Sequence, residues 1–437
     1  MSLEAYLEHT SATRADRLRW WQEARFGMVL HWGPSTELGC SAWGMNRELI
    51  PRDVYDRAAD RWRTRKNAAR EWARLAKEAG QKYVMFTTKN HDGFCLWDTQ
   101  QTDYNSVRRG PERDLVREFV EACREFDLRI AFYYSLMDWH HPDAERSATD
   151  GDARRRFLDF TQGCVRELCS NYGKIDVLFY DMPYPLQGSE QWEQVKMNTM
   201  VRQLQPDILI HMASDLPEDY VCHEQHATPQ AERRAYETTW TLSGNWGWVY
   251  HGAWFHIPSA DEWHSVREII GWLCKITAGG GNLLLDIGPL PNGSLPEEAV
   301  TRLQAVGEWL SRNGEAVYGQ FDRSGGQHGS GWEGVTMDWQ IRGDWTVKGN
   351  TGYYWCYRWP GNELVIAGLQ TRATDASLLA TGDPVTFKQT DKHLILSGLP
   401  AEDPDLIAGV TVIKLEFDGS PRQKIEVWEH PPATYDG

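Results

Sequence analysis

An aspartate that ends an apolar run is the residue best placed for chemistry in this sequence. Residues 177–180 read Val-Leu-Phe-Tyr, with Asp176 directly before them and Asp181 directly after. An apolar run too short for a helix is typical of a strand buried on both faces. In a barrel of parallel strands, catalytic groups gather at the carboxyl ends of the strands. Asp181 is therefore the candidate nucleophile, with capping of the next turn as the alternative, and Asp176 is expected to be structural.

Tryptophans accompany polar groups at several predicted strand ends and in long loops. They are Trp32, Trp43, Trp139, Trp240, Trp246 and Trp248. Any single tryptophan belongs to a core in the ordinary case. Aromatic rings, however, stack on the apolar faces of pyranoses, while carboxylate, imidazole and amide groups hold the hydroxyls. The clustering of these tryptophans with His and Asp therefore favours a glycoside as the substrate.

The elements that would position these groups are parallel strands. Three further apolar runs lead into polar clusters: residues 28–30 into His31-Trp32-Gly33, residues 83–86 into Lys89-Asn90-His91-Asp92, and residues 130–133 into Asp138-Trp139-His140-His141. Segments 64–79 and 114–126 have an apolar stripe at helical spacing and lie between the strands. Alternating strands and helices build a parallel sheet. The sequence thus predicts an α/β fold with a (β/α)8-like TIM barrel.

The pattern changes past about Tyr318. Short alternating runs at 352–357, 363–367 and 410–415 are separated by turn residues. This pattern is typical of an antiparallel β-sandwich. We therefore expect a catalytic barrel at residues 1–320 and a C-terminal β-sandwich at residues 321–437.

Charge, hydropathy and cysteine usage exclude several classes of function. A formal net charge of −16 argues against a nucleic-acid partner. No apolar run approaches the roughly 18 to 20 residues that span a bilayer, and the first residues lack a signal-peptide pattern. Eight cysteines without a C-x-x-C pair suggest neither a disulfide framework nor a zinc cage. We expect a cytoplasmic protein without membrane partner, metal or cofactor, and a homo-oligomer stays open as an alternative to a monomer.

Five segments, taken in order, resemble the α-L-fucosidases of glycoside hydrolase family 29. They are residues 25–33, 88–94, 133–139, 176–181 and 280–289, and the resemblance runs from about residue 17 to 320. It implies a retaining exo-glycosidase with a barrel and a C-terminal β-sandwich. It also implies that the partner is an oligosaccharide or a small glycoside carrying a terminal α-L-fucosyl group, and that no cofactor takes part.

The resemblance further implies roles for single residues. Asp181 falls at the position of the nucleophile, His31, His91 and Tyr134 where fucose hydroxyls are held, and Trp43 where an aromatic ring lines the pocket. The expected substrate-binding residues are His31, Trp43, Asn90, His91, Tyr134, Phe179 and Trp246.

Three positions depart from the family pattern. Asn90 stands where the family usually has a second histidine, Phe179 where it often has tryptophan, and Ala42 where it often has glutamate. The substrate is therefore either an α-L-fucoside or the glycoside of another L-hexose such as L-galactose or L-glucose. A catalytically silent sugar-binding homologue is a further alternative.

Two glutamates compete for the role of acid/base. Glu237 resembles the Trp-Glu segment that precedes a Ser-Trp-Gly-Tyr stretch in the family, and residues 245–248 follow it here as Asn-Trp-Gly-Trp. Glu224 is the rival. A retaining mechanism needs two carboxyls about 5 Å apart, one of them protonated near neutral pH. We choose Glu237, whose pKa must then be raised.

The histidines leave a second chemistry open. His91, Asp92, His140 and His141 follow two predicted strands and could hold the metal of a metal-dependent hydrolase. The sequence offers no pair of histidines spaced for one helix face. No metal is therefore expected, and a glycosidase remains the preferred function.

Overall fold

The computed structural model describes residues 2–225, 234–249, 263–321 and 343–422. Its first sheet consists of β1 (Phe26–Leu30), β2 (Tyr83–Lys89), β3 (Arg129–Ser135), β4 (Val177–Asp181), β5 (Leu209–Ile210), β6 (Val221–Glu224), β7 (Tyr236–Thr241) and β8 (Asn282–Ile287). These strands follow one another in the order β5-β4-β3-β2-β1-β8-β7-β6, and all neighbouring pairs are parallel. The parallel sheet predicted from the apolar runs is thus confirmed.

The two edge strands of this sheet meet, so that the sheet curls into a barrel. His211, which follows β5, forms a parallel bridge with Tyr220, which precedes β6. The Met212 amide donates to the Tyr220 carbonyl at 2.9 Å, and the Asp219 amide donates to the Ile210 carbonyl at 3.1 Å. Closure removes exposed sheet edges. It also brings the carboxyl ends of β1 to β8 around one opening.

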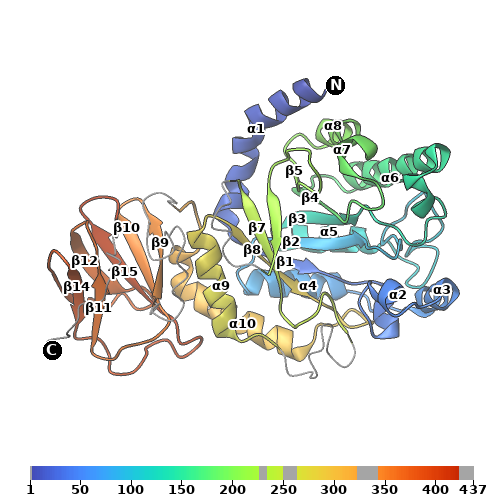
Figure 1. The fold of residues 1–437 in the computed structure, drawn as a ribbon. Helices are drawn as coiled ribbons and strands as arrows, with labels where there is room; N and C mark the ends of the chain where they lie inside the picture. Colours follow the sequence, from blue (N-terminus) through green and yellow to red (C-terminus); the bar gives the residue numbers. More distant parts are fainter. Residues whose placement is uncertain (1, 226–233, 250–262, 322–342, 423–437) are drawn as a thin grey trace, which may run out of the picture. The chain divides into compact units, whose positions relative to one another are not determined.

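Helices surround the strands in the first unit of the chain (Figure 1). They are α1 (Leu3–Ala24), η1 (Pro34–Leu38), α2 (Gly44–Arg47), α3 (Arg52–Arg61), α4 (Ala68–Glu78), α5 (Leu115–Glu125), η2 (Glu145–Ala148), α6 (Gly151–Asn171), α7 (Gly188–Gln191) and α8 (Gln194–Leu204). Helices α4 and α5 fall within the two segments that the apolar stripes predict. Asp114 begins α5 as its N-cap, because its side chain accepts a hydrogen bond from the Arg117 amide.

Apolar side chains fill the barrel, and α1 contributes to the same core. Trp21 of α1 is fully buried in one cluster with Tyr83, Met85 and Val177 of the strands. The Asn282 side-chain amide, at the start of β8, donates to the Trp21 carbonyl at 2.8 Å. Helix α1 therefore covers the amino-terminal end of the barrel. The opposite end is left for the site.

Asp176 has the structural role expected from its place before β4. Its carboxylate accepts hydrogen bonds from the Arg129 guanidinium at 2.8 Å and from the Ile130 amide at 2.9 Å. Both donors belong to the start of β3, so Asp176 ties two neighbouring strands together.

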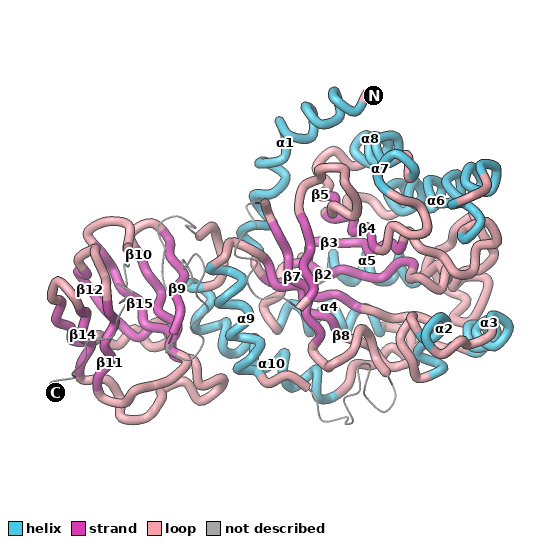
Figure 2. Tube along the Cα trace, in the orientation of Figure 1, coloured by secondary structure: helices cyan, strands magenta, loops and turns pink. Residues whose placement is uncertain are grey.

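The second unit is built mainly of antiparallel strands (Figure 2). They are β9 (Gly343–Lys348), β10 (Thr351–Cys356), β11 (Glu363–Ala367), β12 (Ala373–Leu378), β13 (Thr386–Gln389), β14 (His393–Ser397) and β15 (Thr411–Phe417). A sheet in the order β12-β15-β10-β9 and a sheet in the order β11-β14-β13 share one apolar core. Trp345, Leu394 and Leu415 belong to that core. The predicted β-sandwich is thus confirmed.

The two compact units do not follow a single cut in the sequence. One comprises Met1–Val266 and Gly281–Gly307, the other Arg267–Gly280 and Glu308–Gly437. The second unit thus takes α9 (Val266–Ala278) except its first residue, the end of α10 (Glu297–Asn313) and η3 (Gly314–Ala316). The predicted division at 320/321 assigns these helices to the barrel, and as a statement about domains it stays a prediction.

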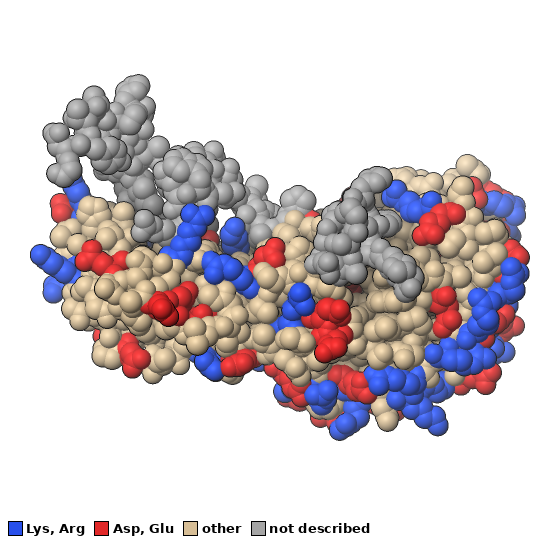
Figure 3. Space-filling model, turned by 90° about the horizontal axis from the view of Figure 1, so that it is seen from below, with Lys and Arg blue, Asp and Glu red and all other residues tan. Residues whose placement is uncertain are grey.

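Surface charge and cysteine state complete the description. On the face drawn in Figure 3, basic and acidic side chains are interspersed rather than gathered by sign. All eight cysteines are free thiols. Among the described helices, none combines the length and the apolar character that crossing a membrane requires.

Candidate active site

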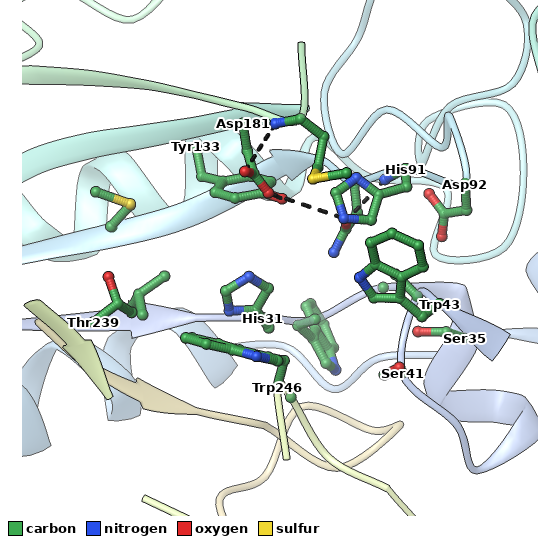
Figure 4. Close-up of a pocket in the computed structure, with 18 of the residues that line it drawn as sticks. His31, Ser35, Ser41, Trp43, His91, Asp92, Tyr133, Asp181, Thr239 and Trp246 are labelled. Carbon is green, nitrogen blue, oxygen red and sulfur yellow. Dashed lines mark hydrogen bonds and ion pairs between the residues drawn. The ribbon is translucent and has the colours of Figure 1, made fainter. Parts of the chain in front are cut away.

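A cavity of about 200 Å³ lies at the carboxyl ends of the barrel strands (Figure 4). Seven of the nine expected site residues line it, together with the rival Glu224: His31, Trp43, Asn90, His91, Phe179, Asp181 and Trp246. These residues lie in, end or follow β1, β2, β4, β6 and β7. The closed barrel thus gathers side chains from distant parts of the sequence in one place.

Two donors orient the carboxylate of Asp181, the last residue of β4. The Tyr133 hydroxyl donates to Oδ2 at 2.5 Å, and the Met182 amide donates to Oδ1 at 2.8 Å. Burial raises the pKa of Asp181, whereas these two hydrogen bonds and nearby His31 favour its charged form. The arrangement presents a fixed, poorly hydrated carboxylate to the cavity. Such a group can attack an anomeric carbon.

His31 is held by a carboxylate that sequence reasoning missed. Its Nδ1 lies 2.6 Å from Oδ1 of Asp286 in β8, and the Gly247 amide donates to Oδ2 of Asp286 at 2.9 Å. Burial lowers the pKa of His31, but the charge and hydrogen bond of Asp286, together with the charges of Asp181 and Glu224, outweigh burial, and the net shift is upward. Because Asp286 fixes the proton on Nδ1, Nε2 is the ring nitrogen left for a ligand. A carboxylate near the end of an apolar strand was the available signal.

His91 is neutral, and its hydrogen bonds decide its tautomer. Nδ1 lies 2.7 Å from Oγ of Ser135, whose hydroxyl donates to the Met137 carbonyl at 2.9 Å. A hydroxyl has one proton, so His91 donates from Nδ1. Burial and the charges of Lys89 and His31 lower the pKa of His91 to about 3. Its Nε2, 3.9 Å from Oδ2 of Asp181, is therefore an acceptor for a substrate hydroxyl.

Aromatic rings wall the cavity. The Trp43 ring stands edge-on to His91 at 5.0 Å, and the Trp246 ring stands edge-on to His31 at 5.6 Å. Phe179 stacks on Tyr133 with ring centroids 5.7 Å apart. Such rings supply flat apolar surface between the polar groups, which is what recognition of a pyranose requires.

Gly247 lets the loop that carries Trp246 approach β1. Its φ of 79° is left-handed, and a Cβ there would lie 3.0 Å from the His31 carbonyl oxygen. A larger residue would therefore strain the backbone and displace the chain beside His31.

The structure brings Glu224, the rival glutamate, to the cavity. Glu224 is the last residue of β6 and lines the cavity with Asp181. Glu224 is exposed at the end of β6, but partial removal of water raises its pKa, the negative charge of Asp181 raises it further, and His31 opposes the rise. Two electrostatically coupled carboxyls with different surroundings are what acid and nucleophile roles require.

Glu237, the glutamate preferred from the sequence, lies elsewhere. It is the second residue of β7 and pairs with Asn282, the first residue of β8, so it belongs to the amino-terminal end of the barrel. Its side chain is fully buried and accepts a hydrogen bond from the Tyr83 hydroxyl. Burial raises its pKa to about 8. The expected shift is present, but the side chain is not among the residues that line the cavity.

Tyr134 is a second predicted residue that the structure does not bring to the cavity. Side chains alternate along a strand, and Tyr133, rather than Tyr134, lines the cavity from β3. The Lys89 ammonium lies 4.9 Å from the centre of the Tyr134 ring. Ser135 pairs with Asp181 in the register of β3 and β4, and Tyr133 shares the face of Ser135. Strand alternation was the signal that would have selected Tyr133.

The proposed metal ligands do not converge. His140 stacks on Tyr104 and lies 3.4 Å from Asp56, whereas the ring of His141 packs against Phe160. Within the described ranges, no group of three His, Cys, Asp or Glu side chains could hold a metal ion.

Comparisons with known proteins agree with this geometry. The sequence profile of the family described as α-L-fucosidase matches residues 2–315. Isoenzyme 1 of α-L-fucosidase from Paenibacillus thiaminolyticus is 30% identical with a TM-score of 0.81, covering 93% of this chain and 100% of that one.

Two further relatives extend the comparison. The tissue α-L-fucosidase of Homo sapiens is 28% identical over an alignment of 429 residues that covers 89% of this chain and 86% of that protein. An α-L-fucosidase from Bacteroides thetaiotaomicron, solved as a trapped covalent intermediate with 2-fluoro-fucosyl fluoride in a Glu→Gln variant, is 25% identical. Its TM-score is 0.78, with 92% of this chain and 96% of that chain covered. Because the family profile spans well over half of the sequence and the fold agrees over nearly all of it, this protein belongs to the α-L-fucosidase family of glycoside hydrolases.

Proposed function

We propose that this protein is an exo-acting, retaining α-L-fucosidase in which Asp181 is the nucleophile and Glu224 the acid/base. The observation that carries the proposal is that both carboxyls line one cavity and that the charge of Asp181 raises the pKa of Glu224. A third carboxyl, Asp92, also lines the cavity, but its oxygens accept hydrogen bonds from the Tyr55 hydroxyl and the Phe94 amide. Asp92 is therefore already engaged by the protein.

The reaction then proceeds in two displacements. Asp181 attacks the anomeric carbon while protonated Glu224 gives its proton to the glycosidic oxygen, so the aglycone leaves as an alcohol and a glycosyl ester forms. Glu224, now a carboxylate, takes a proton from water as that water attacks the anomeric carbon and breaks its bond to the Asp181 oxygen. Asp181 is released, and the sugar keeps its anomeric configuration.

The size and lining of the cavity support the release of one terminal sugar. Its volume of about 200 Å³ is below the roughly 300 to 1,000 Å³ of pockets that hold drug-sized ligands. Neutral His91 would accept a hydrogen bond from one sugar hydroxyl, and His31, whose pKa is raised, would donate a hydrogen bond to another. The covalent intermediate trapped in the Bacteroides thetaiotaomicron relative supports the same course here.

Covalent labelling tests the proposal. Incubation with 2-deoxy-2-fluoro-α-L-fucosyl fluoride should add one glycosyl group per chain, which peptide mass spectrometry should locate on Asp181. Nuclear magnetic resonance of an ordinary aryl fucoside should show the α-anomer of fucose as the first product. Asp181→Ala should take no label and lose activity on the order of 10⁴-fold or more. Initial release of the β-anomer, or a label on another residue, would contradict the proposal.

Another α-L-hexose remains the alternative substrate, because the short side chain of Ala42 lines the cavity. Aryl α-L-galactoside and α-L-glucoside in the same assay decide between the sugars. A catalytically silent homologue would turn over none of the three.

A further inference from the structure

Three aromatic rings form a continuous stack that begins beside the nucleophile. Tyr133 of β3 stacks on Phe179 of β4 with ring centroids 5.7 Å apart and an interplanar angle of 10°. Phe179 in turn stacks on His211, which follows β5, with centroids 4.0 Å apart and an angle of 2°. Tyr133 and Phe179 line the cavity, whereas His211 is not among the described residues that do so. His211 therefore reaches the site only through its neighbours.

The register of the strands explains why the three rings meet. Tyr133 pairs with Phe179 in the register of β3 and β4. Leu178 pairs with Ile210 in the register of β4 and β5. Side chains at paired positions lie beside one another on the same face of a sheet. The second register, continued by one residue, sets Phe179 beside His211, so three neighbouring strands each contribute one ring to the same layer of the barrel.

Two hydrogen bonds fix His211 on β4. Its amide donates to the Leu178 carbonyl at 3.0 Å, and its Nδ1 donates to the Tyr180 carbonyl at 2.8 Å. A carbonyl oxygen only accepts, so Nδ1 carries the proton of the ring. Burial lowers the pKa of His211 to about 4, so the ring is neutral near pH 7. His211 is thus bound to β4 on both sides of Phe179, the residue that it covers.

The stack clamps the ring that orients the nucleophile. Because β3 and β5 flank β4, His211 covers one face of Phe179 and Tyr133 covers the other. On its own other side, the Tyr133 ring stands edge-on to His31 at 5.3 Å. The Tyr133 hydroxyl donates to Oδ2 of Asp181 at 2.5 Å, and Figure 4 shows the two side chains together. A movement of Phe179 would therefore displace the donor at the nucleophile.

We propose that His211 is a positioning residue for the nucleophile: by clamping Phe179, it holds Tyr133 where the tyrosine hydroxyl donates to Asp181. His211 touches neither the substrate nor the reacting atoms. The inference rests on the proposed function, because it takes Asp181 as the nucleophile. The effect of His211 should therefore appear in kcat rather than in KM, and it should depend on the hydroxyl of Tyr133.

Three substitutions separate the ring of His211 from its side-chain hydrogen bond. His211→Ala removes both and should lower kcat on an aryl α-L-fucoside about tenfold, less than the roughly 10²-fold cost of a 1 Å misplacement, while KM changes by less than about threefold. His211→Phe keeps a ring against Phe179 and should retain kcat within about threefold of the wild type. His211→Asn keeps a donor near the place of Nδ1 but no ring, and should lose as much as His211→Ala.

Circular dichroism and thermal unfolding establish that each variant is folded at the temperature of the assay. A kcat of His211→Ala within about twofold of the wild type would overturn the proposal. A folded His211→Phe that is no better than His211→Ala would also overturn it, because the clamp requires only a ring in this place.

A double-mutant cycle tests whether His211 acts through Tyr133. In the Tyr133→Phe background no hydroxyl is left to position, so His211→Ala should lower kcat by less than about twofold there. A loss caused only by looser packing of the barrel would be the same in both backgrounds. Additive losses would therefore overturn the proposal, and the cycle decides even if His211→Phe does not fold.

The pH profile gives a further reading. The hydrogen bond from Tyr133 favours the charged form of Asp181, so its loss raises the pKa of Asp181. The acid limb of kcat/KM reports the nucleophile of the free enzyme. It should move to higher pH in His211→Ala, as in Tyr133→Phe, and stay in place in His211→Phe. An unmoved limb in folded His211→Ala would contradict the proposal. The other titratable neighbours of Asp181 are the same in these variants: His31, His91 and Glu224.

Crystal structures of the wild type and of His211→Ala separate this inference from the proposed function. The Tyr133 hydroxyl should lie at least about 0.5 Å farther from Oδ2 of Asp181 in the variant, the scale on which productive geometry is lost. An unchanged distance refutes the role of His211, whether or not fucosides are hydrolysed. Failure of the wild type to hydrolyse any α-L-fucoside, with the displacement present, refutes the proposed function and leaves the positioning of Tyr133 standing.

Discussion

Strands β6 and β7 are neighbours in the barrel, and each carries one glutamate whose pKa is raised by burial. Glu224 ends β6 and lines the cavity, where the charge of Asp181 adds to the effect of burial. Glu237 lies near the start of β7, fully enclosed with the Tyr83 hydroxyl. The two side chains share a chemical group and a direction of pKa shift. They differ in that Glu224 faces the cavity that Asp181 also lines, whereas Glu237 is enclosed in the core beside Tyr83.

The comparison shows that a raised pKa does not identify an acid catalyst. Removing water from a carboxyl favours its neutral form anywhere in a protein, including a core. Catalysis further requires that the substrate reach the proton and that a second carboxylate stand across the reacting bond. At the mouth of the barrel, Glu224 and Asp181 line the same cavity, as the proposed roles require. At the opposite end, Glu237 faces the hydroxyl of Tyr83 inside the core.

Replacing each of the two glutamates in turn is the most direct test of which one is the acid/base. Glu224→Ala should lower kcat/KM on alkyl or natural fucosides by about 10²- to 10⁴-fold, because their leaving groups need the proton. Activated aryl fucosides should lose far less. Azide should rescue the variant and yield the α-L-fucosyl azide, since a small anion attacks the glycosyl ester without a general base. Steady-state kinetics and product analysis measure both effects.

The matched control for that experiment is Glu237→Gln, which should show neither the dependence on leaving group nor the rescue by azide. If Glu237→Gln shows both signatures and Glu224→Ala shows neither, the assignment is reversed.

A pair of adjacent tyrosines sharpens the contrast between the inner and outer faces of one strand. Tyr133→Phe removes a donor to Asp181 and should lower kcat/KM by about 10- to 100-fold, in the range of 1.4 to 2.7 kcal/mol for a hydrogen bond to a charged group. Tyr134→Phe should leave kcat/KM within about twofold, because the Tyr134 hydroxyl has no partner among the described residues. Assays of the two variants with one substrate compare them. Equal losses would place both rings at the site.

Glu237→Gln is expected to have a small effect on activity and a clear effect on stability. Burial raises the pKa of Glu237 from the usual 4.5 of a glutamate to about 8 in the folded state. The folded protein therefore holds a proton that the unfolded chain has lost between these values, so the contribution of Glu237 to stability is present below about 4.5 and declines up to about 8. Glutamine cannot ionise and should remove this decline.

Thermal unfolding of the wild type and of Glu237→Gln between pH 5 and pH 9 measures the difference. The Tm of Glu237→Gln minus the Tm of the wild type should increase as pH rises. The kcat/KM of the variant at pH 6 should stay within about threefold of that of the wild type. Parallel profiles of Tm against pH would mean that Glu237 is already ionised in the folded protein.

The order of elements could be predicted from the sequence because burial leaves a local pattern. Apolar runs too short for helices predicted β1 to β4, and the apolar stripes at helical spacing in residues 64–79 and 114–126 predicted α4 and α5. The change to short runs that alternate apolar and polar residues predicted the C-terminal β-sandwich. The resemblance to the family likewise rests on short contiguous segments. Each of these signals is contained within a few neighbouring residues.

The depth of Glu237 and the partner of His31 are not local properties. Whether a strand residue lies at the mouth or at the floor of a barrel depends on its register against the next strand, here Glu237 opposite Asn282. That Asp286 holds His31 depends on β8 closing against β1, across 255 residues of sequence.

The sequence by itself determined the family, the architecture and the position of Asp181 at a strand end. Only the tertiary structure decided that Glu224 rather than Glu237 shares the cavity, and that Tyr133 rather than Tyr134 faces it. The physical reason is that apolar periodicity records which residues are buried but not what they are buried against. Register and closure of the sheet supply that second fact, and both arise from pairings between residues far apart in the chain.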